Sequence, residues 1–208
     1  MRAFVGFGEL GRQVEALLPQ PPRDDPVVYF DDPLTGRGHA SARPFAEFVD
    51  DRYRDYEFYV CLGYQHLETK SRLVRELMEL GRRVPAFIHD SCQVSASAAI
   101  GSGALVYPMC VLDKDVSVGD GALINNSVTV SHNAAIGTCA YLSPGVVLCG
   151  YVRIGAQTFV GAGAVISDGV TVGDGVKIGV GTVVTQDIPP GASVIGNPMR
   201  ILDRQLDL

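Results

Sequence analysis

The 208-residue sequence has no tryptophan, only four histidines and no long apolar run. Without a stretch of about 18 apolar residues, a membrane-spanning helix is not expected, and the first residues resemble a strand and a glycine turn more than a signal peptide. Five cysteines without CxxC spacing indicate neither a disulfide framework nor a zinc site. The net charge of -6 is spread along the chain, which argues against nucleic acid as a partner. We therefore expect a soluble, cytoplasmic protein that binds no metal, no nucleic acid and no membrane.

The second half of the chain repeats every six residues. From Ile88 to Val184 every sixth position is Ile, Leu or Val, and the position four residues later is small or β-branched. A helix would need apolar residues every three or four positions, and an ordinary strand alternates in twos. A period of six instead predicts a solenoid, in which three hexads form one triangular coil of about 18 residues. Glycines after the aliphatic residue, such as Gly101 and Gly119, are expected because the corners are tight.

The first 85 residues follow a different pattern. Apolar residues 3–5 precede the turn Gly6-Phe7-Gly8-Glu9-Leu10-Gly11, and an amphipathic helix is predicted over 13–18. Strands over 27–30 and 57–62 and a helix over 67–80 complete an alternation that predicts a small parallel α/β sheet. A Gly-x-Gly-x-x-Gly turn lets amides at a helix N-terminus approach phosphate, although it also fits a tight turn in any α/β protein.

A dinucleotide-dependent dehydrogenase is one alternative for this turn. Asp31 lies twenty residues beyond Gly11, which is the spacing of a dinucleotide-binding fingerprint. However, the domain has only about half the strands of such a fold, and the repeats offer no hydride-transfer chemistry. Half a fold suits a mononucleotide better.

Several motifs together resemble one family. The glycine turn, Asp31-Asp32 after the second strand, Leu62-Gly63-Tyr64 after the third and the repeats from Ile88-His89 onward are similar to bacterial hexapeptide-repeat sugar acetyltransferases of the sialic acid O-acetyltransferase type. That group includes N-acetyltransferases that act on nucleotide-linked amino sugars. The resemblance implies a Rossmann-like sheet over 1–85 that binds a nucleotide-linked sugar, a left-handed parallel β-helix over 86–190 with the acyltransferase site, a C-terminal tail over 191–208 near acyl-CoA, and a homotrimer.

The resemblance also implies which residues contact the substrate. Those carried over for the nucleotide-linked sugar are Gly8, Leu10, Gly11, Asp31, Asp32, Gly63 and Tyr64. Those carried over for acetyl-CoA, the expected co-substrate, are Gly150, Gly161, Ala162, Gly179, Val180, Asn197, Pro198 and Arg200, with Lys177 as a further phosphate contact. Leu10 stands where some members have a histidine that touches the substrate, so the identity of the sugar stays open.

Acyl transfer needs a base and a donor for the oxyanion. Of the two histidines in the repeats, His89 is expected to pack before the first full coil, whereas His132 ends a segment similar to the one that carries the family's catalytic histidine. Gly150 follows one coil later, so we expect it to stack over His132 and to point its N–H at the thioester carbonyl. Many relatives have Asp or Glu after the histidine. Asn133 can fix the tautomer but stabilises imidazolium less, which slightly favours N-acetylation.

Other functions remain open at this stage. One is an O-acetyltransferase acting on a sialic-acid-like or surface-polysaccharide sugar, and another is a non-catalytic scaffold that binds a nucleotide sugar. γ-Type carbonic anhydrases use the same helix but need three histidines around zinc. Two histidines in the repeats cannot supply that site.

Overall fold

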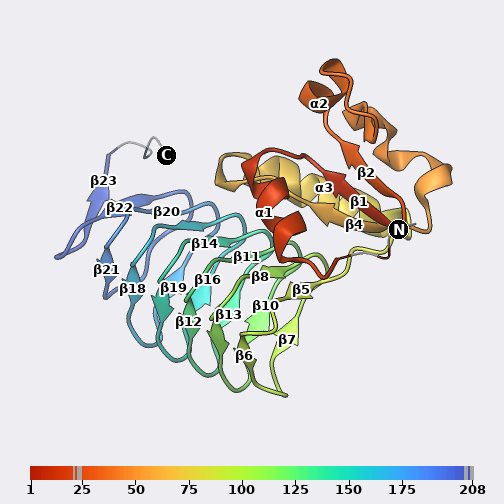
Figure 1. The fold of residues 1–208 in the computed structure, drawn as a ribbon. Coiled ribbons are helices and arrows are strands. Elements are labelled where there is room, and N and C mark those ends of the chain that lie inside the picture. Colours follow the sequence, from red (N-terminus) through yellow and green to blue (C-terminus); the bar gives the residue numbers. More distant parts are fainter. Residues whose placement is uncertain (21, 23–24, 204–205, 207–208) are drawn as a thin grey trace. The chain divides into compact units, whose positions relative to one another are not determined.

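The computed structural model describes residues 1–20, 22, 25–203 and 206. The chain divides into two compact units, Met1–Pro85 and Ala86–Leu208. The first unit is a sheet with helices and the second is a stack of short strands (Figure 1). Within the described ranges, no helix combines the length and the apolar character needed to cross a membrane.

The first unit is built on four parallel strands in the order β3-β2-β1-β4. The strands are β1 (Arg2–Val5), β2 (Val27–Phe30), β3 (Ala42–Arg43) and β4 (Glu57–Val60), and the helices are α1 (Glu9–Leu17), α2 (Asp32–Gly36), α3 (Leu67–Glu79), η1 (Phe45–Val49), η2 (Asp51–Tyr53) and η3 (Tyr64–His66). Fully buried Phe30 and Phe58 on the sheet and Leu73 and Leu77 on α3 form its core. This arrangement confirms the predicted small parallel sheet.

Helix α1 begins at Glu9, four residues before the predicted helix over 13–18. Gly8 is its N-cap, so only the first part of the glycine motif is a turn. Gly11 lies inside the helix, where an added Cβ would come within 2.8 Å of the Phe7 ring and 3.0 Å of the Gly6 carbonyl oxygen. The helix therefore packs too closely on the turn for any other residue at that position.

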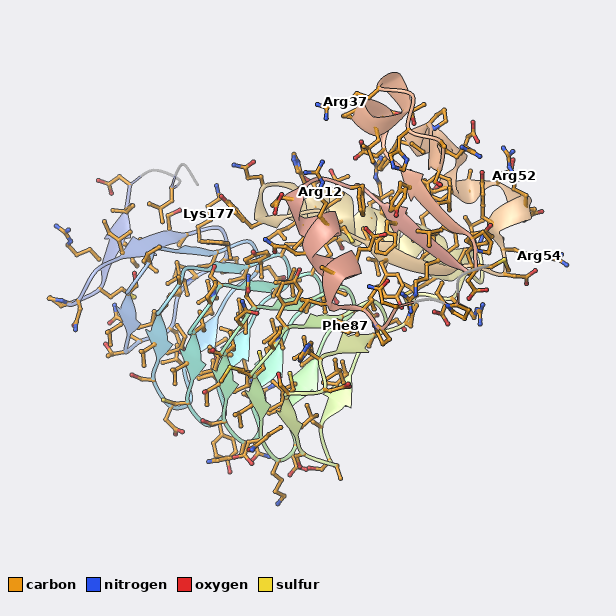
Figure 2. The ribbon with its side chains drawn as sticks, in the orientation of Figure 1. Arg12, Arg37, Arg52, Arg54, Phe87 and Lys177 are labelled. Carbon is orange, nitrogen blue, oxygen red and sulfur yellow. The ribbon has the colours of Figure 1, made fainter. Side chains whose placement is uncertain are left out.

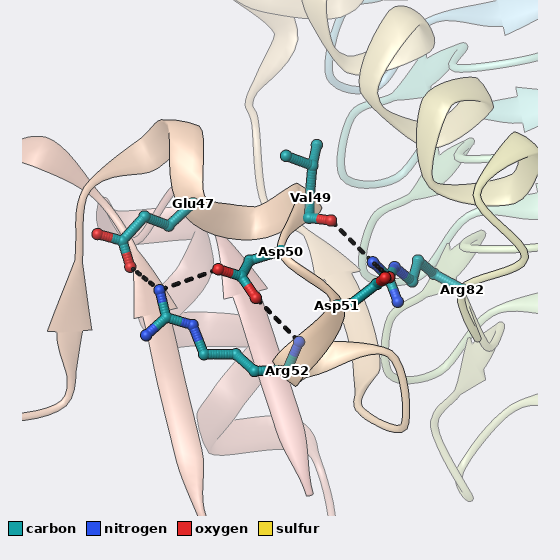
Figure 3. A network of polar contacts seen from close by, with 6 residues as sticks. All are labelled: Glu47, Val49, Asp50, Asp51, Arg52 and Arg82. Atoms are coloured by element: carbon teal, nitrogen blue, oxygen red, sulfur yellow. Dashed lines mark hydrogen bonds and ion pairs between the residues drawn. The ribbon is translucent and has the colours of Figure 1, made fainter.

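A polar network holds the segment between β3 and β4 (Figure 3). The guanidinium of Arg82, which is 7% exposed, donates to the Val49 carbonyl at 2.8 Å and to Asp51 at 3.1 Å. On the surface, Arg52 pairs with Glu47 at 3.0 Å and with Asp50. Because a buried charge that loses its partner costs far more than an exposed one, the Arg82 contacts matter most for this segment.

The second unit is a three-sided prism. Its first face contains β5 (Phe87–Ile88), β8 (Leu105–Val106), β11 (Leu123–Ile124), β14 (Tyr141–Leu142), β17 (Phe159–Val160), β20 (Lys177–Ile178), β22 (Ser193–Ile195) and antiparallel β23 (Arg200–Leu202). Its second face contains β6 (Gln93–Val94), β9 (Val111–Leu112), β12 (Thr129–Val130), β15 (Val147–Leu148), β18 (Val165–Ile166) and β21 (Val183–Val184). Its third face contains β7 (Ala99–Ile100), β10 (Ser117–Val118), β13 (Ala135–Ile136), β16 (Arg153–Ile154) and β19 (Thr171–Val172).

The six-residue aliphatic series lies inside this prism. From Val106 to Val184 its members are at most 4% exposed, and equivalent strands pair in parallel with a shift of one coil, as Val130 with Leu148. Each aliphatic side chain thus packs on the one a coil above and below, and that burial is the main stabilising term of the unit. The predicted left-handed parallel β-helix is confirmed.

The glycines after the aliphatic residue serve a purpose other than the expected one. A Cβ on Gly119, Gly137 or Gly155 would approach the backbone of the next coil to 2.6, 2.5 and 2.4 Å, so they allow coils to stack closely. The left-handed backbone of the corners occurs two residues later, for example at Asn133 with φ 60° and Tyr151 with φ 59°.

Candidate active site

Equivalent residues of successive coils gather at the corner between the second and third faces. Two residues after strands β12, β15 and β18 come His132, Gly150 and Asp168, each one coil above the last. The residues that follow the first two are Asn133 and Tyr151. We call these five residues the His132 corner.

Within this corner, the imidazole of His132 lies against Gly150. A Cβ built on Gly150 would be 2.7 Å from His132 Cε1, 2.9 Å from Nε2 and 2.7 Å from Asp168 Oδ1. Only glycine leaves room for both side chains. The bond between these coils is made by the Tyr151 N–H, which donates to the His132 carbonyl at 3.0 Å, and the Gly150 N–H has no acceptor among the residues that the structure describes. The expected stacking is present.

The ring of His132 has neighbours on two further sides. Its Nδ1 lies 3.2 Å from Asn133 Oδ1, and its ring meets that of Tyr151 edge to face at a centroid distance of 5.2 Å. If Nδ1 carries the proton and donates to Asn133, Nε2 is left with a lone pair that can accept one. His132, Tyr151 and Asp168 are exposed, whereas Gly150 is buried.

The residues predicted for acyl-CoA lie elsewhere on the same prism. Ala162 and Val180 occupy the corner between the first and second faces, two residues after β17 and β20, and Val180 is 75% exposed. Gly161 and Gly179 precede them, and a Cβ on Gly161 would come within 2.6 Å of Gly179. Within one chain, the structure therefore brings His132, Asn133 and Gly150 together but not these four.

The predicted residues of the tail lie between and within the last two strands. Asn197, Pro198 and Arg200 are exposed. Lys177 on β20 (Figure 2) donates from Nζ to the Leu206 carbonyl at 2.9 Å. A phosphate contact by Lys177 would replace or share that bond.

A cavity of about 420 Å³ opens at the carboxyl ends of β1, β2 and β4 in the first unit. It is lined by five of the seven predicted substrate residues, Gly8, Leu10, Asp31, Gly63 and Tyr64. Gly11 packs on Phe7 behind it, and Asp32 instead accepts the Phe45 N–H at 2.8 Å. Open parallel sheets bind ligands at this edge.

Asp31 is already engaged by the backbone around the cavity. Its carboxylate accepts the Phe7 N–H at 2.8 Å and the Leu34 N–H at 2.9 Å, so it joins the glycine turn to the start of α2. The fingerprint spacing has a structural explanation, and any contact of Asp31 with a ligand is additional to it.

Two glycines of the cavity are not required by packing or by backbone conformation. A Cβ on Gly8 or Gly63 would meet no atom within 4 Å, and their φ angles of -75° and -76° suit any residue. By contrast Gly6, with φ 78°, could not carry a side chain without meeting Leu62. Open glycines at a helix N-terminus leave its first amides accessible to an anion.

Cys61 at the base of this cavity is a buried thiol. Burial raises its pKa to about 12, so it stays protonated and unreactive at neutral pH. This argues against an acyl-cysteine intermediate there. Among the described residues, no group of three or more His, Cys, Asp or Glu is placed to hold a metal ion.

Sequence reasoning missed several residues of both sites. His66, at the N-cap of α3, lines the cavity. Asp168 and Tyr151 belong to the His132 corner. Adding one coil length to Gly150 would have identified Asp168, whereas His66 carries no motif.

Comparisons with known proteins agree with this architecture. Residues 151–186 match the family model described as bacterial transferase hexapeptide (six repeats). A search of curated proteins finds no significant match. Many solved structures do match.

The acetyltransferase domain of PglB from Neisseria gonorrhoeae is 29% identical, with a TM-score of 0.85 over 96% of this chain and 98% of that one, and it has also been solved with acetyl coenzyme A. PerB from Caulobacter crescentus, solved with CoA and GDP-perosamine, is 28% identical, with a TM-score of 0.84 over 96% of each chain. WeeI from Acinetobacter baumannii, at 24% identity, covers 97% of this chain and 99% of its own with a TM-score of 0.85 and shares the fold.

These likenesses confirm the predicted resemblance to hexapeptide-repeat sugar acetyltransferases. The chain shares the architecture of these proteins over nearly its whole length.

Proposed function

We propose that this protein transfers an acetyl group from acetyl-CoA to the amino group of a sugar carried on a nucleotide. The observation that carries the proposal is the imidazole of His132 packed against Gly150, whose N–H meets no acceptor in the described part of the chain. A base beside a main-chain donor is the pair of groups that acyl transfer from a thioester requires. Structures of two similar proteins contain acetyl coenzyme A, or CoA with GDP-perosamine, which supports both substrate classes.

The cavity of the first unit is the proposed nucleotide site. The first amides of α1 follow Gly8, and Gly63 leads into η3 and then α3, so the N-termini of two helical segments border the cavity. Both carry partial positive charge that favours phosphate. Glu9, which also lines the cavity, pairs with Arg12 at 4.0 Å, so its negative charge is partly balanced. A nucleoside diphosphate is the ligand that these features fit best.

The proposed reaction takes place at the His132 corner. His132 Nε2 accepts a proton from the nucleophile as its nitrogen attacks the thioester carbonyl, and the Gly150 N–H stabilises the oxyanion that forms. When the intermediate collapses, the C–S bond breaks and the thiolate of CoA takes the proton back from the imidazolium. The products are an N-acetylated sugar and free CoA, and atoms and charge balance.

The neighbour of the histidine supports an amine as the accepting group. Asn133 holds Nδ1 at 3.2 Å but brings no negative charge to stabilise imidazolium. An amine is the stronger nucleophile and depends less on full proton removal in the transition state than a hydroxyl does. N-acetylation is therefore preferred to O-acetylation. The proposed location is the cytoplasm, because acetyl-CoA and nucleotide sugars are made there.

A homotrimer is part of the proposal. The second face of the prism separates the His132 corner from the corner with the predicted acyl-CoA residues, so one chain alone does not bring the two together. Its outward residues are half-buried or exposed, and four of the six are valines: Gln93, Val111, Thr129, Val147, Val165 and Val183. On the third face the equivalent residues are Ala99, Ser117, Ala135, Arg153 and Thr171. Packing the second faces of three copies around an axis would cover the valines. It would also bring the corner of one copy that carries Ala162 and Val180 to the His132 corner of the next.

A direct assay tests the proposal. Purified protein is mixed with acetyl-CoA and a panel of UDP-, GDP- and dTDP-linked sugars with an amino or only hydroxyl groups, and CoA release is followed with a thiol reagent. Release that depends on an amino sugar and product mass increased by one acetyl group would support N-acetylation. Release with hydroxyl-only sugars would favour O-acetylation, and binding without release would favour a scaffold.

A further inference from the structure

Tyr151 stands out in the column of residues to which it belongs. The positions one coil apart from Asp115 to Gly169 have positive φ values of 56°, 60°, 59° and 71°, and they hold Asp, Asn, Tyr and Gly in turn. Asp, Asn and Gly tolerate the left-handed conformation, whereas a bulky side chain there is strained. Among the described non-glycine residues with positive φ, Tyr151 is the only aromatic one.

Burial does not compensate for this strain. Tyr151 is 55% exposed, so much of its ring remains in water. No hydrogen bond of its hydroxyl is made to the described residues. A strained and exposed aromatic residue needs another reason, and such positions cluster at functional sites.

The contact that Tyr151 does make is with His132. The rings meet nearly at right angles, 84°, with centroids 5.2 Å apart. The backbone adds to this, because the Tyr151 N–H donates to the His132 carbonyl at 3.0 Å. Asn133 restrains the exposed imidazole at Nδ1, and the tyrosine ring restrains a second side, which leaves Nε2 beside Gly150.

We infer that Tyr151 is a positioning residue: its ring holds the imidazole of His132 against Gly150. The inference rests on the proposed role of His132 as the base. The left-handed backbone is what turns the tyrosine ring toward the corner, so the strain and the contact have one origin. Without the Tyr151 ring, the imidazole would rotate away from the Gly150 amide more often. Small misplacements of a catalytic group lower turnover strongly.

The test compares three variants of the full-length protein. Tyr151→Asn removes the ring and supplies a residue that tolerates positive φ, so the melting temperature should stay equal or rise. Its kcat should fall about tenfold, with KM for both substrates changed less than about twofold. Tyr151→Phe keeps the ring and should retain kcat. Gln157→Asn is the matched control, since Gln157 also has a positive φ (54°) and lies on the corner between the third and first faces, away from the His132 corner and from the predicted acyl-CoA residues Ala162 and Val180.

A spectroscopic readout addresses the contact itself. The Cε1–H signal of His132, assigned by its loss in His132→Ala, should carry a ring-current shift in the wild type and in Tyr151→Phe and should lose it in Tyr151→Asn. A kcat of Tyr151→Asn within twofold of wild type, or an equal loss in Tyr151→Phe or Gln157→Asn, overturns the inference. An active His132→Ala would refute the proposed function itself. An inactive His132→Ala beside a fully active Tyr151→Asn would refute only the role of Tyr151.

Discussion

The candidate functional residues of the two units are recognised in different ways. In the β-helix the six-residue period assigns each position an inward, outward or corner place, so His132 and Tyr151 stand out as departures from the repeat. The α/β unit has no such frame. There four glycines of one cavity region look alike in the sequence, yet Gly6 and Gly11 are required by packing whereas Gly8 and Gly63 face open space. In a regular repeat, a residue that departs from the pattern can be found in the sequence. Where no repeat exists, only the contacts in the structure distinguish glycines needed for packing from glycines that border a candidate site.

The largest effect is expected from His132→Ala. Loss of the proposed base should lower kcat by about 10²- to 10⁴-fold, while the melting temperature stays the same because the side chain is exposed. The control is His89→Ala, a histidine that instead bonds Ser91 at 2.8 Å and lies outside the corner. Steady-state kinetics and a thermal melt measure both. Wild-type turnover in His132→Ala would remove the mechanism.

The second-largest loss of turnover is expected from Gly150→Ala. The new methyl would occupy the point that lies 2.7 Å from both His132 Cε1 and Asp168 Oδ1, so the imidazole must move. We expect kcat to fall by about a hundredfold, with an ordinary circular dichroism spectrum. Thr138→Ala changes the equivalent repeat position on another corner and should be neutral. If both variants turn over normally, the amide and the imidazole do not act together.

Val165→Lys tests whether the second face is shared between copies. A lysine among the valines would bury a charge on assembly, so light scattering should show the 22.2 kDa monomer in place of a species of three chains. Activity should fall on the order of tenfold or more. Thr171→Lys places the same charge on the third face and should change neither quantity. Assembly and activity that survive Val165→Lys would exclude this face as the interface.

The smallest effect tests the first unit. Gly8→Asp offers α1 a good N-cap and places a negative charge where a phosphate is proposed, so the melting temperature should not fall, while KM for the nucleotide sugar should rise about tenfold. KM for acetyl-CoA serves as the internal reference and should not change. An unaltered KM for the nucleotide sugar would mean that the open space at Gly8 is not a phosphate site.

The sequence predicts the regular parts of the fold well. The strand over 27–30 coincides with β2, the helix over 67–80 differs from α3 by one residue, and the aliphatic series lies in the prism as expected. The prediction that Gly150 stacks on His132 followed from coil length alone. It could not be predicted that α1 starts at Glu9, because a glycine motif does not show where turn becomes helix, nor that Asp31 is bound to two amides. Contacts between side chains, such as Tyr151 with His132, are set by packing.

Stacking by coils also limits which changes in chain length would preserve the His132 corner. Removing one hexad between His132 and Gly150 would leave the aliphatic series intact but set Ala156 above the histidine, and the Ala156 N–H is already bonded to Asp174 at 2.7 Å. Adding one hexad would set Pro144 there, which has no N–H. Between His132 and Gly150, insertions and deletions that keep a free amide beside the histidine are therefore confined to whole coils.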